Sequence, residues 1–338
     1  MRQKKSQIST QFAWIFILIA GAIILIFFIS LVYKQKAVSE TKLSATVLTQ
    51  LETILTGAGL SPGTVNIIDT PEIELNLICD ETGYSTYFVN KVSGPDNPPQ
   101  VIFAPDIIKG KKLITWALGF NAPFRVTNFL YLSSPDIKYV LINPSSEVTR
   151  SLPEEFTIEI TSSISEITTQ GFEKIRLVFF DLDPAQIQVP LQLQSKNTDV
   201  SAVRISQGTA TFYKLSADRS RFEQEGTLPC VDMPSLYGAI FAQDFIFYEC
   251  SMKKAFKRLN LVAKIYAARE NALLDYFTNN PSIQDCRLYY YNKTSDVVSH
   301  SEQCNQNIRN CISSLIFDIG ELENNQINLL RKSCPLIY

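Results

Sequence analysis

The chain has 338 residues, of which 46% are hydrophobic and 19% are charged, a composition typical of globular proteins. Its net charge of −2 is unevenly distributed, because residues 1–36 contain five basic and no acidic residues, whereas the remainder contains 26 basic and 33 acidic ones. A mildly acidic folded region without a basic stripe does not neutralise a phosphate backbone, which argues against nucleic acid as a partner.

A continuous apolar segment lies near the N-terminus. Residues 12–33, Phe12 to Tyr33, contain no charged side chain. A helix of this length extends about 33 Å, enough to cross a hydrocarbon core of roughly 30 Å. The run is longer than the apolar core of a secretory signal and lacks a small-residue cleavage site after it. We therefore expect an uncleaved transmembrane helix that makes this a single-pass protein of the lipid bilayer.

The basic residues around this helix indicate its orientation. Three precede the apolar run and two follow it. The positive-inside bias predicts that residues 1–11 are cytoplasmic and that the bulk of the chain is extracytoplasmic, at the cell membrane. Asn292 opens an Asn-x-Thr sequon and is a candidate glycosylation site, which favours the same orientation.

The residues directly before the apolar run form a second pattern. Residues 4–12 read KKSQISTQF. This segment resembles an archaeal class III signal peptide, the processing site of type IV pilin-like proteins. The resemblance implies cleavage between Ser6 and Gln7, places Gln11 where a Glu is common, and implies that the apolar helix is kept as an assembly core. Ser6 stands where Gly is commonest and Gln11 is neutral, so a plain signal anchor is the alternative.

A helical pattern continues beyond the apolar run. Apolar residues recur at the spacing of one helix face at Val47, Leu51, Ile54, Leu55 and Ala58. Gly57 and Gly59 then supply a helix-ending signal. We expect residues 34–59 to form an amphipathic stalk packed under a folded region.

From residue 62 the pattern changes to short apolar runs separated by proline-rich turns, which indicates strands. The predicted strands are Thr64–Ile68, Glu72–Ile78, Val101–Phe103, Phe129–Leu132, Tyr139–Ile142, Arg176–Phe180, Ala202–Ser206 and Thr209–Leu215. Residues 153–170 allow a helix or a strand. A helix there would make the strands on either side of it parallel, as one crossover unit. The expected fold class is α+β, with a mixed sheet domain over residues 62–230.

The C-terminal region, residues 236–338, carries two apolar seams with helical period. The first comprises Phe241, Phe245, Tyr248, Met252, Ala255, Leu259, Val262 and Tyr266; the second comprises Ile308, Ile312, Leu315, Ile319, Leu322 and Leu329. This pattern predicts an antiparallel helical hairpin packed on the sheet domain, with a partner-binding coiled coil as the alternative. Residues 287–291 are a candidate strand between the two helices.

Six of the seven cysteines lie beyond residue 229, and clustering of this kind in an extracytoplasmic region predicts disulfides. In a two-helix hairpin the start of the first helix lies beside the end of the second, which predicts a Cys250–Cys334 pair. At the other end, Cys286 would meet Cys304 or Cys311. A zinc site is the alternative, although there is no C-x-x-C motif and only one histidine.

Candidate catalytic groups are few. Residues 59–63 match G-x-S-x-G, but the motif follows a helix and its serine precedes Pro62, which has no N–H for an oxyanion hole. The one histidine, His300, lies in a polar segment that we interpret as a solvated loop. No catalytic residue and no cofactor is therefore predicted.

One acidic pair stands out. Asp181 and Asp183 follow the apolar strand that ends at Phe180. Two carboxylates at a strand end are suitable ligands for Mg²⁺ and superficially resemble the site of the haloacid dehalogenase-like phosphatases. Pro184 replaces the Gly usual in that family. A strand-ending turn is the simpler interpretation.

Together these features favour a non-enzymatic surface protein of the pilin-like or adhesin-like kind, with surface or envelope proteins as its partners. One alternative is a membrane-tethered metal-dependent enzyme that uses Asp181 and Asp183. The other is a subunit of an envelope complex that uses the helical hairpin as its interface.

Overall fold

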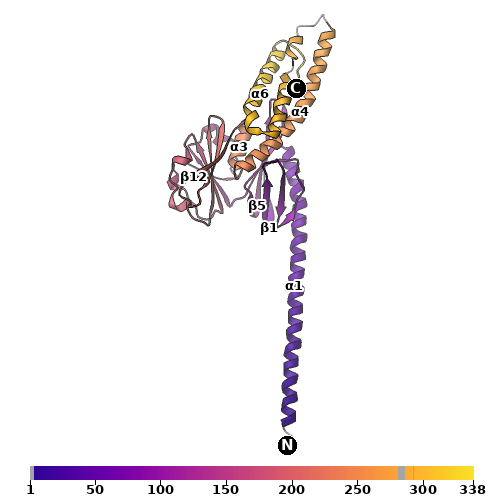
Figure 1. Ribbon diagram of the computed structural model, residues 1–338, viewed down its shortest axis with the longest axis vertical. Coiled ribbons are helices and arrows are strands. Elements are labelled where there is room, and N and C mark those ends of the chain that lie inside the picture. Colours follow the sequence, from indigo (N-terminus) through magenta and orange to yellow (C-terminus); the bar gives the residue numbers. More distant parts are fainter. Residues whose placement is uncertain (1–3, 281–285, 292) are drawn as a thin grey trace.

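The computed structural model describes residues 4–280, 286–291 and 293–338; within the first helix, side chains 4–17, 20, 33, 36–41, 43, 58 and 59 lie outside this description. The molecule consists of a long helix, α1 (Lys4–Leu60), that projects from a head built of two sheets and a helical bundle (Figure 1). The predicted α+β class is confirmed, because both sheets contain parallel and antiparallel strand pairs.

The C-terminal part of α1 packs on the head. Val47, Leu51 and Leu55 are at most 5% exposed and belong to the main hydrophobic core, on the face expected for the stalk. The amide of Asn90 donates a hydrogen bond to Ser44 Oγ over 3.3 Å, which joins the helix to the first sheet. The helix ends at Leu60, directly after the glycines that signalled its end.

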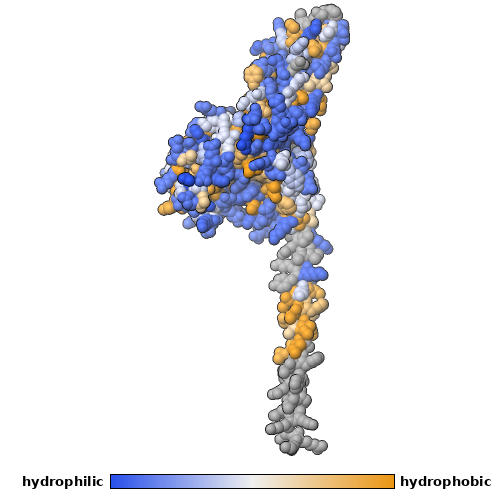
Figure 2. Space-filling view, in the orientation of Figure 1, coloured by the Kyte–Doolittle hydropathy of each residue, from blue (hydrophilic) through white to orange (hydrophobic). Residues whose placement is uncertain are grey.

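The N-terminal part of α1 projects away from the head. Eleven large apolar side chains between Leu18 and Val32 are 46–69% exposed and form an apolar band below the head (Figure 2). Within the described residues, no helix combines the length and the hydrophobicity needed to cross a membrane. The predicted span, residues 12–33, lies in α1, but several of its side chains fall outside the described part.

The first sheet has the strand order β3-β2-β1-β5-β6-β4, in which only β4 and β6 pair in parallel. Its strands are β1 (Val65–Cys79), β2 (Ser85–Val89), β3 (Val92–Ser93), β4 (Val101–Phe103), β5 (Ile107–Asn121) and β6 (Arg125–Ser133). Two predicted strands, Thr64–Ile68 and Glu72–Ile78, are one continuous strand. The polar segment of residues 69–71, which was predicted to separate two strands, is accommodated by a register shift between Asp69 and Ile73.

The second sheet has the order β12-β11-β10-β9-β7-β8. Its strands are β7 (Ile137–Ile142), β8 (Thr157–Thr161), β9 (Lys174–Phe180), β10 (Asp199–Ser206), β11 (Thr209–Leu215) and β12 (Phe222–Pro229). β7 and β9 are parallel, as a crossover unit requires. The connection between them, however, contains the short helix α2 (Ser146–Ser151) and strand β8, not a helix over residues 153–170.

The helical region differs from the predicted hairpin. It contains α3 (Met233–Phe241), α4 (Phe245–Asn279), α5 (Lys293–Gln306) and α6 (Ile308–Arg331). The prediction of two helices was wrong because α5 was taken for a polar loop: it buries only Thr294, Val297, Ser301 and Cys304, too few apolar residues for a visible seam. The candidate strand 287–291 is not present: residues 286–289 form a 3-10 turn, and residues 290–291 are not in a strand.

Helix α3 lies at the junction of the two sheets (Figure 1). Phe241 packs within 6.1 Å of Trp116 of the first sheet and within 4.7 Å of Tyr139 of the second, measured between ring centroids. At the other end of α3, Asp232 accepts a hydrogen bond from the Ser235 N–H over 2.8 Å and closes a capping box. Desolvation at this junction raises the pKa of Asp232 from 3.8 to about 6.

The pKa of Asp232 predicts a specific pH dependence of stability. Because its pKa is higher in the folded chain than in the unfolded chain, the free energy of unfolding should fall as the pH rises from about 4 to about 6. Asp232→Asn keeps a good cap but cannot ionise. We expect the variant to match the parent near pH 4 and to exceed it by about 1–3 kcal/mol near pH 7 in urea unfolding. A pH-independent difference between the two proteins contradicts the assignment.

Candidate functional site

A basic groove follows α4 where it passes the loops of the first sheet. The main hollow has a volume of about 580 Å³. On α4 it is lined by Lys253, Lys254, Lys257 and Arg258, and on the facing wall by residues 82–84 and 97–99. The four basic residues occupy one helix face, because positions three and four apart are neighbours on a helix.

A second hollow of about 310 Å³ adjoins the first, since Pro99 and Arg258 line both. It leads to Arg125 at the start of β6 and to Thr56 and Leu60 at the end of α1. We use the name basic groove for the two hollows together. Positive charges therefore occur along its whole length.

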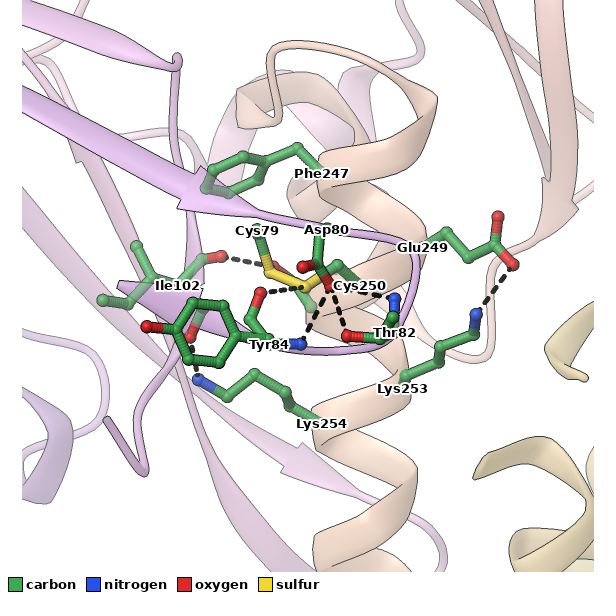
Figure 3. Close-up of a disulfide and its surroundings, with 12 residues drawn as sticks. Cys79, Asp80, Thr82, Tyr84, Ile102, Phe247, Glu249, Cys250, Lys253 and Lys254 are labelled. Carbon is green, nitrogen blue, oxygen red and sulfur yellow. Dashed lines mark hydrogen bonds and ion pairs between the residues drawn. A yellow bond between two sulfur atoms is a disulfide. The ribbon is translucent and has the colours of Figure 1, made fainter. Parts of the chain in front are cut away.

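A disulfide holds the wall of the groove against the helix (Figure 3). It joins Cys79, the last residue of β1, to Cys250 in the second turn of α4. In the following loop, Asp80 Oδ1 accepts hydrogen bonds from the Thr82 hydroxyl over 2.6 Å, the Thr82 N–H over 2.9 Å and the Tyr84 N–H over 3.2 Å. These hydrogen bonds, that of the Thr82 hydroxyl first, lower the pKa of Asp80.

Lys254 is the most confined cation of the groove. Its ammonium donates hydrogen bonds to Ser85 Oγ over 2.7 Å and to the Pro98 carbonyl over 2.5 Å, both neutral acceptors. Desolvation, together with the nearby charges of Arg258 and Lys257, lowers its pKa to about 8. The charge of Lys254 is thus held in a position that disfavours it.

Two acidic groups next to the groove have cationic partners. Glu302 pairs with Lys264 over 3.4 Å, and Glu249 pairs with Lys253 over 3.3 Å and with Arg309 over 3.0 Å. Within the part of the chain that the structure describes, Lys254, Lys257 and Arg258 form no ion pair. This arrangement can bind an anion, because ammonium and guanidinium groups form strong charge-assisted hydrogen bonds with carboxylate, sulfate or phosphate.

The predicted metal ligands have protein partners. Asp181 Oδ1 accepts a hydrogen bond from Ser206 Oγ over 2.8 Å. Asp183 Oδ1 caps the 3-10 turn Pro184–Gln186 and accepts a hydrogen bond from the Tyr213 hydroxyl over 3.1 Å. Among the described residues there is no group of three or more His, Cys, Asp or Glu side chains suited to a metal. The metal site therefore stays a prediction.

The predicted disulfides are present, but with other partners than expected. The pairs are Cys79–Cys250, Cys286–Cys334 and Cys304–Cys311. The Cys250–Cys334 pair and the pairing of Cys286 with Cys304 or Cys311 were wrong. Because α5 runs back between α4 and α6, the end of α6 lies near the far end of α4 instead of its start. Cys230 is the free thiol, and desolvation raises its pKa to about 12.

The remaining candidates are placed as follows. His300 lies in α5, where its Nδ1 contacts the Asp318 carboxylate of α6, so it is not in a loop. The G-x-S-x-G segment spans the last two residues of α1 and the turn of residues 61–63 that follows. The side chains of Ser6, Gln7 and Gln11, and all of Asn292, lie outside the described residues.

Sequence reasoning missed the basic groove. Its signal is two basic pairs four residues apart, at positions 253–254 and 257–258, but on a helix such pairs usually mark a solvated face. The loops that turn this face into the wall of a hollow follow β1 and precede β4, far away in the chain. Comparisons with models of protein families, with curated proteins and with solved structures gave no match, so the function is inferred from the residues of this chain alone.

Proposed function

We propose that this chain is a single-pass membrane protein whose residues 12–33 lie in the bilayer and whose head is extracytoplasmic, where it acts as a non-enzymatic surface protein of the pilin-like or adhesin-like kind. The proposal rests on the contrast between the two ends of α1. Its apolar side chains between Leu18 and Val32 are exposed, whereas Val47, Leu51 and Leu55 are buried against the head. Large apolar side chains each gain about 1.5–3 kcal/mol on leaving water, and insertion of the band into lipid provides that gain.

The cysteines support the extracytoplasmic location of the head. Six of the seven form disulfides, and all six lie beyond the proposed bilayer segment. Disulfides persist in oxidising compartments and are rare where thiols are kept reduced. The head is therefore assigned to the outer side, in agreement with the charge bias around the anchor.

The form of α1 supports the pilin-like interpretation. The helix has 57 residues; its C-terminal part, from Ser44 onward, packs on the head, while its N-terminal part projects. A projecting apolar helix is what the resemblance of residues 4–12 to a class III signal peptide implies for assembly. An adhesin-like protein with a plain signal anchor uses the same helix as an anchor only.

The anchor is tested by extracting membranes that contain the full chain with alkaline carbonate. We expect the parent to stay in the membrane pellet. Ile23→Lys combined with Ile26→Lys should release it, because a charged residue near the bilayer centre costs about 2.5–3.5 kcal/mol. Phe317→Lys combined with Leu330→Lys is the matched control, since these side chains are also exposed and apolar but lie on α6.

The outcomes of this experiment separate the alternatives. Release of the parent by carbonate rejects the anchor, as does retention of the doubly charged variant. The N-terminal peptide of the retained chain, measured by mass spectrometry, begins at Gln7 if the chain is processed like a pilin. It begins at Met1 or Arg2 if the chain has a plain signal anchor.

A further inference from the structure

The basic groove contains three cations that form no ion pair within the described part of the chain. Lys254, Lys257 and Arg258 are neighbours on one face of α4, a spacing at which like charges repel. Among the described residues, one acid lines the groove, Glu302, and it pairs with Lys264. The low pKa of Lys254 has the same origin, since burial and the two neighbouring cations both disfavour its charge. A bound anion would relieve all three cations at once.

The shape of the groove favours an extended ligand. Its two hollows, of about 580 and 310 Å³, meet at Arg258 and Pro99, and both are open to solvent. Lys254 and Lys257 lie in the first hollow and Arg125 in the second. Sites for small molecules usually enclose most of the ligand surface. An open groove with cations at successive positions instead fits a chain that carries several negative charges.

The wall opposite α4 has the chemistry of a saccharide site. It presents the hydroxyl oxygen of Thr82 as an acceptor, the amides of Asn97 and Gln100, and the ring of Tyr84, a residue that is 39% exposed. Hydroxyl and amide groups bind sugar hydroxyls, and an exposed aromatic ring can stack on the apolar face of a sugar. A peptide strand would instead need backbone N–H partners, which Pro98 and Pro99 lack.

From these observations we infer that the basic groove binds a linear acidic polysaccharide, with its carboxylate or sulfate groups on Lys254, Lys257, Arg258 and Arg125. The inference deepens the proposed surface function and rests on it for access to such a polymer outside the cell. Binding by the purified protein does not depend on the location of the head. A failed binding assay and a failed anchor are therefore distinguishable.

The test measures binding of the purified full chain in detergent micelles by isothermal titration calorimetry. The probes are polygalacturonate for carboxylates, heparin for sulfates, neutral dextran, polyglutamate and single-stranded DNA. At about 50 mM salt we expect one or both acidic polysaccharides to bind, with an affinity that falls as salt rises, and dextran not to bind. Which of the two binds identifies the anionic group.

A charge-reversal pair locates the site. Lys257→Glu combined with Arg258→Glu should lower the affinity roughly tenfold or more, since both cations contact the polymer. Both residues are exposed, so the fold should tolerate the change, which circular dichroism verifies. Lys111→Glu combined with Lys112→Glu is the control, because it reverses the same charge on an exposed pair in β5.

Three results overturn the inference. One is the absence of binding to both acidic polysaccharides. The second is equal loss of affinity in the control pair, which indicates general electrostatic attraction in place of a site. The third is tighter binding of polyglutamate or DNA, which assigns the groove to another class of polymer.

Discussion

Replacing Cys79 and Cys250 together with alanine is expected to lower the free energy of unfolding by about 5 kcal/mol, on the loop-entropy estimate for a disulfide. The cysteines are separated by 171 positions, so their bond strongly restricts the unfolded chain. It also joins β1, the strand that follows α1 directly, to α4. The measurement is guanidinium unfolding of the full chain in detergent under non-reducing conditions.

The matched control is the pair Cys304 and Cys311, which are only 7 positions apart. The same estimate gives about 2.5 kcal/mol for its replacement by alanine, because a short loop loses little freedom when it is closed. An equal or larger loss from the control pair contradicts the argument from loop length. We also expect the loss of the Cys79 bond to loosen residues 80–84 and thus the wall of the basic groove.

Arg176→Ala is expected to lower the free energy of unfolding by about 3–5 kcal/mol, because it removes a buried charged donor and leaves its buried acceptors without a hydrogen-bond partner. Arg176 lies in β9 and is 4% exposed. Its guanidinium donates hydrogen bonds to the carbonyls of Ala239 over 3.0 Å, Ile240 over 3.3 Å and Gln243 over 3.0 Å. These carbonyls lie at and just beyond the C-terminal end of α3, where a positive charge is favourable.

Two further variants make this prediction specific. Arg176→Lys keeps the charge but loses the planar fork that reaches several carbonyls, so an intermediate loss is expected. Arg221→Ala, at a side chain that is 71% exposed, should change the free energy of unfolding by less than about 1 kcal/mol. If Arg176→Ala lowers the free energy of unfolding as little as Arg221→Ala does, then the hydrogen bonds from Arg176 of β9 to α3 contribute little to holding the second sheet against the helices.

Much of the sheet structure could be predicted from local patterns. The bounds of β4 and β11 agree with prediction, because each is a run of β-branched and aromatic residues between clear turn signals. β5 was missed, since its first residues include Lys109, Lys111 and Lys112 and do not read as a strand. Its burial is decided by pairing with β1 and β6, which no local pattern reveals.

The disulfide pairing depended on one undetected helix. Counting α5 as a loop places the end of α6 beside the start of α4, and every pairing inferred from that geometry then fails. α5 is polar over most of its length and is held by specific contacts, such as the hydrogen bond from Asn260 Nδ2 to Ser301 Oγ over 3.1 Å. Contacts of this kind arise from tertiary structure and leave no periodic signal.

The basic groove could not be predicted from the sequence for a similar reason. The basic residues of α4 are visible in the sequence, but their lack of ion-pair partners is not. It results from where Glu302 and Glu249 find their partners, Lys264 on α4 and Arg309 on α6. Asp181 and Asp183 were predicted as metal ligands because an acidic pair is easy to recognise in a sequence. Their hydrogen bonds with Ser206 and Tyr213 form only in the folded chain.

The bond between Cys79 and Cys250 also determines how the molecule responds to tension. A pull on α4 that is resisted at α1 passes through Cys250 to Cys79 and then along β1 into the helix, entirely through covalent bonds. Residues 80–249, which include eleven of the twelve described strands, β2 to β12, lie in the loop that this covalent path bypasses. The head can thus transmit a sustained load to its projecting helix without unfolding its second sheet.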